Sequence, residues 1–108
     1  MRLAPNFLIK RPRVAEHDVT GTVLDANNST RFKAGDPVFG LVKGFPADKQ
    51  GALAQYVAIS EESLAIRPDN LSVHEAAGLG LVAMTSLKSV LQDGQAEDGQ
   101  HVLVNGGL

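Results

Sequence analysis

Short runs of β-branched and apolar residues, separated by turn-forming residues, fill the chain from Asp18 to about Ile66. Such runs are typical of strands, because branched and aromatic side chains pack well on a pleated surface. The segments between them are rich in Gly, Asn, Asp and Pro, and Pro37 can stand only at the start or edge of a strand. The pattern predicts a small barrel or sandwich, with strands near residues 19–24, 38–42, 53–59 and 64–66.

The pattern changes at Ser72, where a capping box begins a helical stretch. Ser72 and Glu75 have the spacing that lets each side chain accept the backbone N–H of the other residue. Residues 73–92 are rich in Ala, Leu and Met, and Gly94 is placed to end the helix. Glycine is unfavourable inside a helix. We therefore expect two helical pieces or one kinked helix, because of Gly78 and Gly80.

The last residues, His101 to Gly107, form a short apolar run that ends in glycines. In dinucleotide-binding units a strand leads into a glycine-rich turn, and the helix that follows receives the pyrophosphate at its N-terminus. A strand that ends in glycines is also typical of an ordinary turn. Its position after a helix favours the start of a nucleotide-binding domain. Because the chain ends at Leu108, we expect it to be part of a larger enzyme.

Composition and charge exclude several classes of partner and of chemistry for this chain. The 108 residues allow one domain, and the net charge of −2 gives no reason to expect nucleic acid or an anionic membrane as a partner. No apolar stretch approaches the length of a membrane span. The chain contains no cysteine, which excludes disulfides, thiolate catalysis and cysteine-ligated zinc within it. A cytoplasmic location is the default expectation, with a mitochondrial one left open.

Two groups of residues are candidates for chemistry. Glu16, His17 and Asp18 bring three ionisable groups together before a strand, but neighbouring strand residues face opposite sides, so we expect no metal there. Thr85 falls in the middle of the helical stretch. A threonine at such a position usually bonds back to the preceding turn, and the functional alternative is that its hydroxyl meets a ligand in a cleft.

Taken in order, these motifs resemble the medium-chain dehydrogenase/reductase superfamily, and most closely its quinone-oxidoreductase-like and enoyl-reductase-like members. The resemblance covers nearly the whole chain. It is carried by residues 16–23, 32–40, 51–57, 71–72, 75–77 and 102–107, together with Pro68. It identifies Gly21, Gly35, Asp36 and Gly40 as residues that set turns, and Tyr56 as a packing residue.

The resemblance implies a mainly β fold with helices, in two parts. Residues 1–92 would form a partial GroES-like catalytic domain with a helical connection, and residues 93–108 a linker and the first strand of a Rossmann domain. NADPH or NADH would bind the complete enzyme, with Thr85 near the nicotinamide and Asn105, Gly106 and Gly107 at the glycine-rich turn. Hydride would pass to an activated C=C bond, a quinone or a carbonyl. No catalytic residue is assigned.

The departures from the family pattern point to a zinc-independent branch. His17 matches a zinc ligand of the alcohol-dehydrogenase branch, but Leu81 stands where that branch has a cysteine, so no zinc is expected. The complete enzyme, which the resemblance allows to be a homodimer, would have further residues before Met1 and after Leu108. We therefore expect the 108 residues alone to be inactive. The alternatives are a non-catalytic GroES-like barrel that acts as a binding or oligomerisation module, and a truncated product without independent function.

Overall fold

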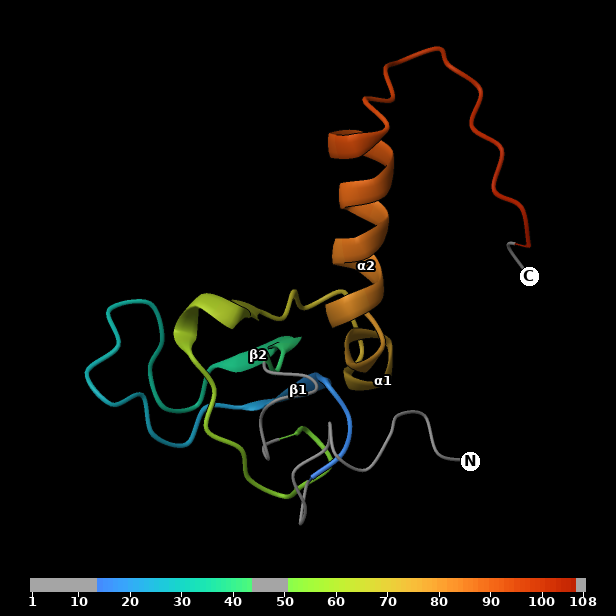
Figure 1. Cartoon of the computed structure of the whole chain (residues 1–108). Helices are drawn as coiled ribbons and strands as arrows, with labels where there is room; N and C mark the ends of the chain where they lie inside the picture. Colours follow the sequence, from blue (N-terminus) through green and yellow to red (C-terminus); the bar gives the residue numbers. More distant parts are fainter. Residues whose placement is uncertain (1–13, 44–50, 107–108) are drawn as a thin grey trace.

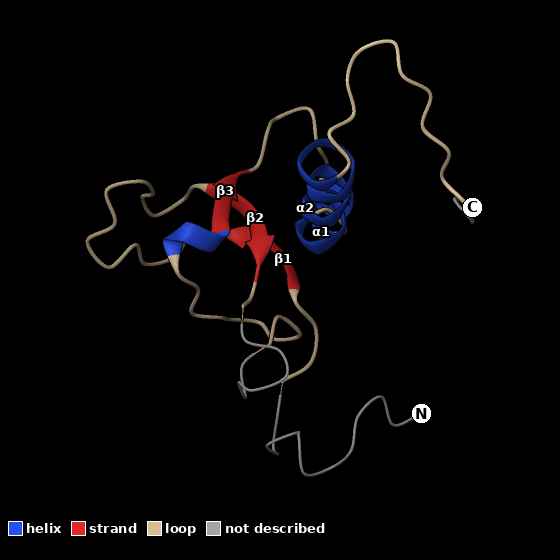
Figure 2. Cartoon of the chain, turned by 45° about the horizontal axis from the view of Figure 1, so that its top comes forward, coloured by secondary structure: helices blue, strands red, loops and turns tan. Residues whose placement is uncertain are grey.

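A three-stranded antiparallel sheet forms the centre of the computed structural model, which describes residues 14–43 and 51–106. Its strands are β1 (Asp18–Thr22), β2 (Pro37–Leu41) and β3 (Leu64–Ile66), in the order β1-β2-β3. The central strand pairs Phe39 with Thr20 on one side and with Ala65 on the other. Figure 2 shows the sheet beside the two α-helices. The strands predicted at 19–24, 38–42 and 64–66 are thus confirmed, with Pro37 at the start of β2.

The connection from β1 to β2 is closed by a glycine turn. Val23 N–H donates to the Asp36 carbonyl at 3.0 Å, and Gly35 N–H donates to the Val23 carbonyl at 2.8 Å. Gly35 has a φ of 96°, a backbone angle that residues with a Cβ rarely adopt. The carboxylate of Asp36 accepts the Lys33 N–H at 2.9 Å. The turn roles expected for Gly35 and Asp36 are confirmed.

The buried core is small and lies around β2. Its apolar members are Phe32, Val38, Val42 and Ala76. Phe32 enters it from the β1–β2 connection, where its N–H and that of Arg31 both donate to the hydroxyl of Ser29 at 3.1 Å. The Arg31 guanidinium covers the Phe32 ring at 5.2 Å and donates to the Glu61 carbonyl of the 3-10 helix η2 (Glu61–Ser63). These bonds tie the connection to the segment that leads into β3.

The helical stretch consists of three consecutive pieces. They are α1 (Val73–Ala77), α2 (Gly80–Leu87) and a π-helical continuation, η3 (Lys88–Asp93). Gly78 caps α1, and Gly94 closes η3 by donating its N–H to the Ser89 carbonyl at 2.9 Å. Both the break between the pieces and the end at Gly94 are confirmed. In Figure 1 the column formed by α2 and η3 projects away from the sheet, and none of the helices in the described residues is long and apolar enough to cross a membrane.

The predicted capping box is present at the start of α1. Ser72 Oγ accepts the Glu75 N–H at 3.2 Å, while the Ser72 N–H and hydroxyl donate to the Glu75 carboxylate at 2.9 and 2.7 Å. The hydroxyl bond and then the backbone bond of Ser72 lower the pKa of Glu75 below its ordinary value. A lowered folded-state pKa means that the stabilisation is present above the pKa of the unfolded chain and is lost as the pH falls through the folded one.

We therefore expect acidification below about pH 4, the region where an unfolded glutamate begins to bind protons, to weaken the protein through this cap. Glu75→Gln should flatten that part of the dependence of unfolding free energy on pH, measured by urea titration. Glu62→Gln, at an exposed glutamate outside the box, is the matched control variant. Equal pH profiles for Glu75→Gln and the natural protein would contradict the role of the box.

Three expectations fail in the described part of the chain. No strand forms at 53–59, because Ala54 N–H turns back onto the Ala52 carbonyl at 2.8 Å and diverts the chain after its short pairing with residues 15 and 16. Tyr56 is 75% exposed rather than packed. Neither Gly21 nor Gly40 sets a turn. Gly21 lies within β1, and Gly40 lies within β2, where a Cβ would meet the Ser63 carbonyl oxygen.

The GroES-like barrel and the Rossmann strand are not confirmed. The strands form an open three-stranded sheet with two α-helices, that is, a small β + α arrangement. Residues 101–104 are not assigned as a strand, and Leu103 is 92% exposed. A parallel strand needs hydrogen-bonded neighbours reached by crossover connections, and the part of the chain that the structure describes supplies none beside this segment. A turn does follow at Asn105 and Gly106, where Gly106 has a φ of 75°.

Candidate functional site

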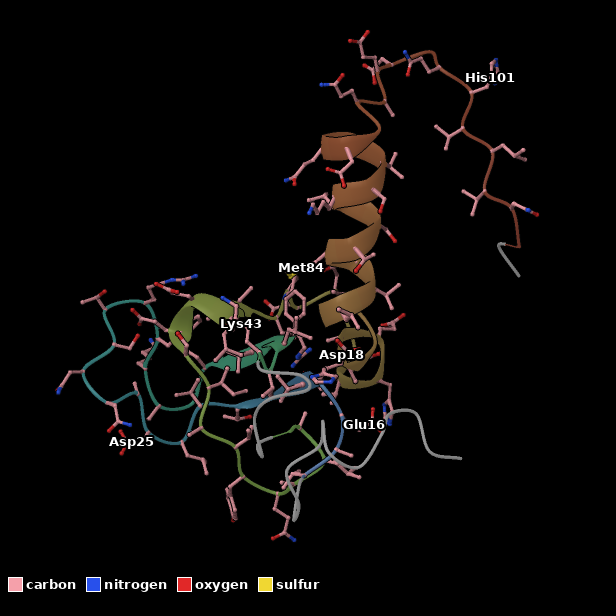
Figure 3. All side chains as sticks on the ribbon, in the orientation of Figure 1. Glu16, Asp18, Asp25, Lys43, Met84 and His101 are labelled. Atoms are coloured by element: carbon pink, nitrogen blue, oxygen red, sulfur yellow. The ribbon has the colours of Figure 1, made fainter. Side chains whose placement is uncertain are left out.

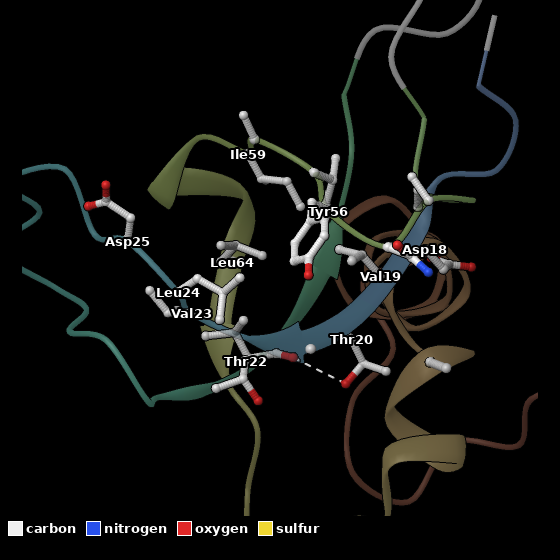
Figure 4. Close-up of a pocket in the computed structure, with 18 of the residues that line it drawn as sticks. Asp18, Val19, Thr20, Thr22, Val23, Leu24, Asp25, Tyr56, Ile59 and Leu64 are labelled. Carbon is white, nitrogen blue, oxygen red and sulfur yellow. Dashed lines mark hydrogen bonds between the residues drawn. The ribbon is translucent and has the colours of Figure 1, made fainter.

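An open hollow of about 910 Å³ lies beside β1, between this strand and residues 52–59. Its lining is mixed: apolar side chains from β1, residues 57–59 and the start of β3, with Asp18 and Asp25 toward its two ends. Figure 4 shows the Tyr56 ring over the hollow. The Thr20 hydroxyl donates to the Val38 carbonyl of β2 at 3.1 Å, the dashed line in that view. The hollow is thus lined by residues of β1 and by apolar side chains of the segment that faces it.

The predicted cofactor residues do not line this hollow. Thr85 is exposed on α2, and its hydroxyl donates to the Leu81 carbonyl one turn earlier at 2.8 Å. Asn105 and Gly106 are exposed in the last described turn, and Gly107 lies outside the described residues. Figures 1 and 2 both show the segment 101–106 away from α2, so Thr85 and Asn105 are not brought together.

Glu16, His17 and Asp18 diverge rather than converge. The carbonyl of Glu16, which has a φ of 68°, accepts the Ala52 N–H at 3.0 Å. His17 Nδ1 donates to the Val42 carbonyl at 3.2 Å, so this nitrogen carries the proton. Asp18 begins β1 and turns toward the helices. Among the described residues, no group of three His, Cys, Asp or Glu side chains is arranged to hold a metal ion.

Asp18 instead binds the start of α2. Its Oδ1 accepts the Leu81 N–H at 2.5 Å, a contact between residues 63 positions apart. Figure 3 labels Asp18 where β1 meets the base of the helices. The contact is allowed by Gly80, which is buried against the Gly40 carbonyl and the Asp18 carboxylate, where a Cβ has no room. Sequence reasoning missed this bond; the glycine before Leu81 was the one available signal.

Comparison with known proteins identifies relatives over most of the chain. It is 37% identical over 100 residues to a 2-methylene-furan-3-one reductase of Solanum lycopersicum, an alignment that covers 89% of this chain and 26% of the relative. It is 34% identical over 100 residues to the chloroplastic NADPH-dependent alkenal/one oxidoreductase of Arabidopsis thaliana, with the same shares covered. A trans-enoyl reductase of Gibberella fujikuroi is 33% identical over 99 residues, 83% of this chain and 29% of that protein.

No family model and no solved structure matches the chain. The chain spans about a quarter of the length of the curated relatives it matches. These relatives are quinone, alkenal and enoyl oxidoreductases, in agreement with the order of motifs along the sequence. The chain is thus homologous to part of the quinone, alkenal and enoyl oxidoreductases and belongs to the medium-chain dehydrogenase/reductase superfamily.

Proposed function

We propose that this chain is part of a zinc-independent, NAD(P)H-dependent reductase that transfers hydride to an activated C=C bond, a quinone or a carbonyl. The observation that carries the proposal is the 34% identity, over 100 residues, to a protein named as an NADPH-dependent alkenal/one oxidoreductase. In this proposal residues 1–92 belong to the GroES-like catalytic domain, and residues 93–108 lead into the nucleotide-binding domain. The cytoplasm is the proposed location, although chloroplastic and mitochondrial proteins are among the relatives.

The residues proposed to meet the cofactor have suitable local geometry. Thr85 is exposed on α2, and its hydroxyl oxygen keeps acceptor capacity while its hydrogen is donated to Leu81. Gly106 has a φ of 75°, and nothing lies within 4 Å of where its Cβ would stand, so its backbone is open to a pyrophosphate. The bound nicotinamide supplies the hydride. The chain's own residues supply orientation, which accounts for much of the rate in hydride-transfer enzymes.

Zinc independence is supported by the donor set of the described residues. Leu81 stands at the proposed cysteine position, and its N–H is bound by Asp18. The chain contains no cysteine thiolate. The catalytic zinc of the alcohol-dehydrogenase type is held by two cysteines and one histidine, and the 108 residues supply no cysteine for such a site.

The test is an assay of NADPH oxidation by the enzyme in which this chain is joined to its nucleotide-binding domain. With a conjugated enone and a benzoquinone as acceptors, we expect turnover that is unchanged after incubation with a metal chelator. The 108 residues alone should oxidise no NADPH. Loss of activity on chelation would contradict zinc independence, and absence of NADPH oxidation with every acceptor would contradict the reductase itself.

A non-catalytic binding or oligomerisation module is the second candidate. The observation that favours it is the number of large apolar side chains left exposed on the helical column, namely Leu81, Val82, Met84, Leu87 and Leu91. Exposed apolar patches often mark interaction sites. A stable, concentration-dependent oligomer of the 108 residues, with no NADPH oxidation by the larger protein, would favour this reading over the reductase. The homodimer proposed for the complete enzyme would be tested separately, by measuring the oligomeric state of that enzyme.

A further inference from the structure

The first turn of α2 is capped from a distant strand. The first N–H groups of an α-helix have no partner within the helix. The residue before α2, Leu79, offers no side-chain cap, whereas Asp18 Oδ1 accepts the Leu81 N–H at 2.5 Å. A carboxylate at this end of a helix is also favoured by the helix dipole. Asp18 is half-buried at the start of β1, so the bond anchors the helix to the sheet.

The same residue, Leu81, connects this anchor to Thr85. Its N–H is held by Asp18, and its carbonyl accepts the Thr85 hydroxyl at 2.8 Å. The second bond fixes the rotamer of Thr85, because a helical threonine chooses between two χ1 positions according to whether its hydroxyl bonds the preceding turn. The direction of the Thr85 side chain therefore follows the placement of the first turn of α2.

The first turn of α2 packs closely against the sheet at Gly80. Gly80 is buried, and a Cβ on it would overlap the Gly40 carbonyl oxygen and come within 2.6 Å of Asp18 Oδ1. Beyond this contact the helix projects away from the sheet (Figure 1), and all residues from Leu81 to Ser89 are exposed. The orientation of α2 is thus set at its base, by the close approach of Gly80 and by the single charge-assisted bond of Asp18.

We propose that Asp18 is a positioning residue of the reductase: through its bond to the Leu81 N–H it fixes the base of α2 and so aims Thr85 at the cofactor. The cofactor half of this statement rests on the proposed function. The helix half does not, since it concerns only the bond between β1 and α2. The competing explanation is that Asp18 merely adds stability, and the two differ in what they predict for cofactor binding.

The test measures amide hydrogen exchange at Leu81 and the KM for NADPH in the full-length enzyme. Asp18→Ala should speed exchange at Leu81 by about tenfold or more, the equivalent of a hydrogen bond to a charged group. It should raise the KM for NADPH several-fold with a smaller change in kcat. Asp18→Asn, which keeps an acceptor oxygen of the same shape, should restore most of both values. Asp69→Ala, at an exposed aspartate before α1, should change neither.

A double-mutant cycle separates positioning from stability. Thr85→Val keeps the side-chain shape but removes the hydroxyl, and should raise the KM for NADPH by itself. If Asp18 acts through Thr85, the fold-increase in KM for NADPH of the double variant should be well below the product of the two single fold-increases. If Asp18 acts only on stability, the fold-increase of the double variant should equal that product.

Each outcome decides a different part. Unchanged exchange at Leu81 in both Asp18 variants would overturn the anchor. Faster exchange with an unchanged KM, or effects that multiply, would overturn positioning and leave Asp18 a structural cap. If the natural enzyme does not bind NADPH, the proposed function fails and the cofactor half fails with it, while the exchange data still decide the anchor. If Asp18→Ala does not fold, Asp18→Leu, which has a side chain of similar shape without an acceptor oxygen for the Leu81 N–H, takes its place. Unchanged exchange at Leu81 and an unchanged KM for NADPH in that variant would overturn the proposal.

Discussion

Replacing Gly80 with alanine should lower the free energy of unfolding by about 1–3 kcal/mol or more, the usual cost of forcing an extra carbon into a packed site. The new Cβ would overlap the Gly40 carbonyl oxygen and approach Asp18 Oδ1 to 2.6 Å. Neither neighbour can yield easily, because Gly40 is held within the central strand and Asp18 is engaged with Leu81. Relief would require the base of α2 to move away from the sheet.

Gly78, two residues earlier, provides the matched control. Its φ of −97° is accessible to alanine, and the nearest atom to its would-be Cβ, the Glu75 carbonyl oxygen, is 4.0 Å away. Gly78→Ala should therefore be neutral or stabilise the protein by about 0.4–1 kcal/mol, because it restricts the unfolded chain without straining the folded one. Urea unfolding of the two variants measures the contrast. Equal stabilities would show that the α2–sheet approach is looser than the structure has it.

Features fixed by neighbouring residues were predicted from the sequence. The capping box of Ser72 and Glu75 needs only a spacing of three residues, and its three hydrogen bonds are present. The break between α1 and α2 follows from Gly78 and Gly80, and the back-bond of Thr85 from the ordinary behaviour of a helical hydroxyl. The strands β1, β2 and β3 were visible as β-branched runs between turns.

Features that depend on residues far apart in the chain were not predicted from the sequence. Residues 53–59 and 101–104 have strand-like composition, but a strand forms only where a ladder of hydrogen bonds continues along it, and neither segment is a strand in the described structure. Tyr56 was expected to pack, yet it is 75% exposed beside the hollow. The bond from Asp18 to Leu81 spans 63 positions, and no local pattern encodes that separation. The family resemblance supplied Thr85 as a candidate, whereas the residue that holds its helix emerged only from the geometry.

Phe32→Ala should have the largest effect of any truncation in the described core, a loss of about 3–5 kcal/mol. Phe32 is the one aromatic among the buried apolar residues, and the others, Val38, Val42 and Ala76, are too small to fill the space its ring would leave. The Arg31 guanidinium over the ring contributes less, about 0.5–1 kcal/mol at an exposed site. Most of the expected loss of stability therefore comes from the cavity that the missing ring leaves, and less from the lost Arg31 contact.

Two further variants separate the stability cost of the cavity from other effects of the substitution. Phe32→Leu keeps most of the volume but removes the ring, and should cost less than about 1.5 kcal/mol. Leu24→Ala, at a side chain that is 68% exposed, should stay within about 0.5 kcal/mol of the natural protein. Unfolding by urea, followed by circular dichroism, ranks the three. If Phe32→Ala ranked with Leu24→Ala, the β1–β2 connection would contribute little to stability. With the expected order, a core built around one ring and the central strand holds the sheet on which both Asp18 and the base of α2 depend.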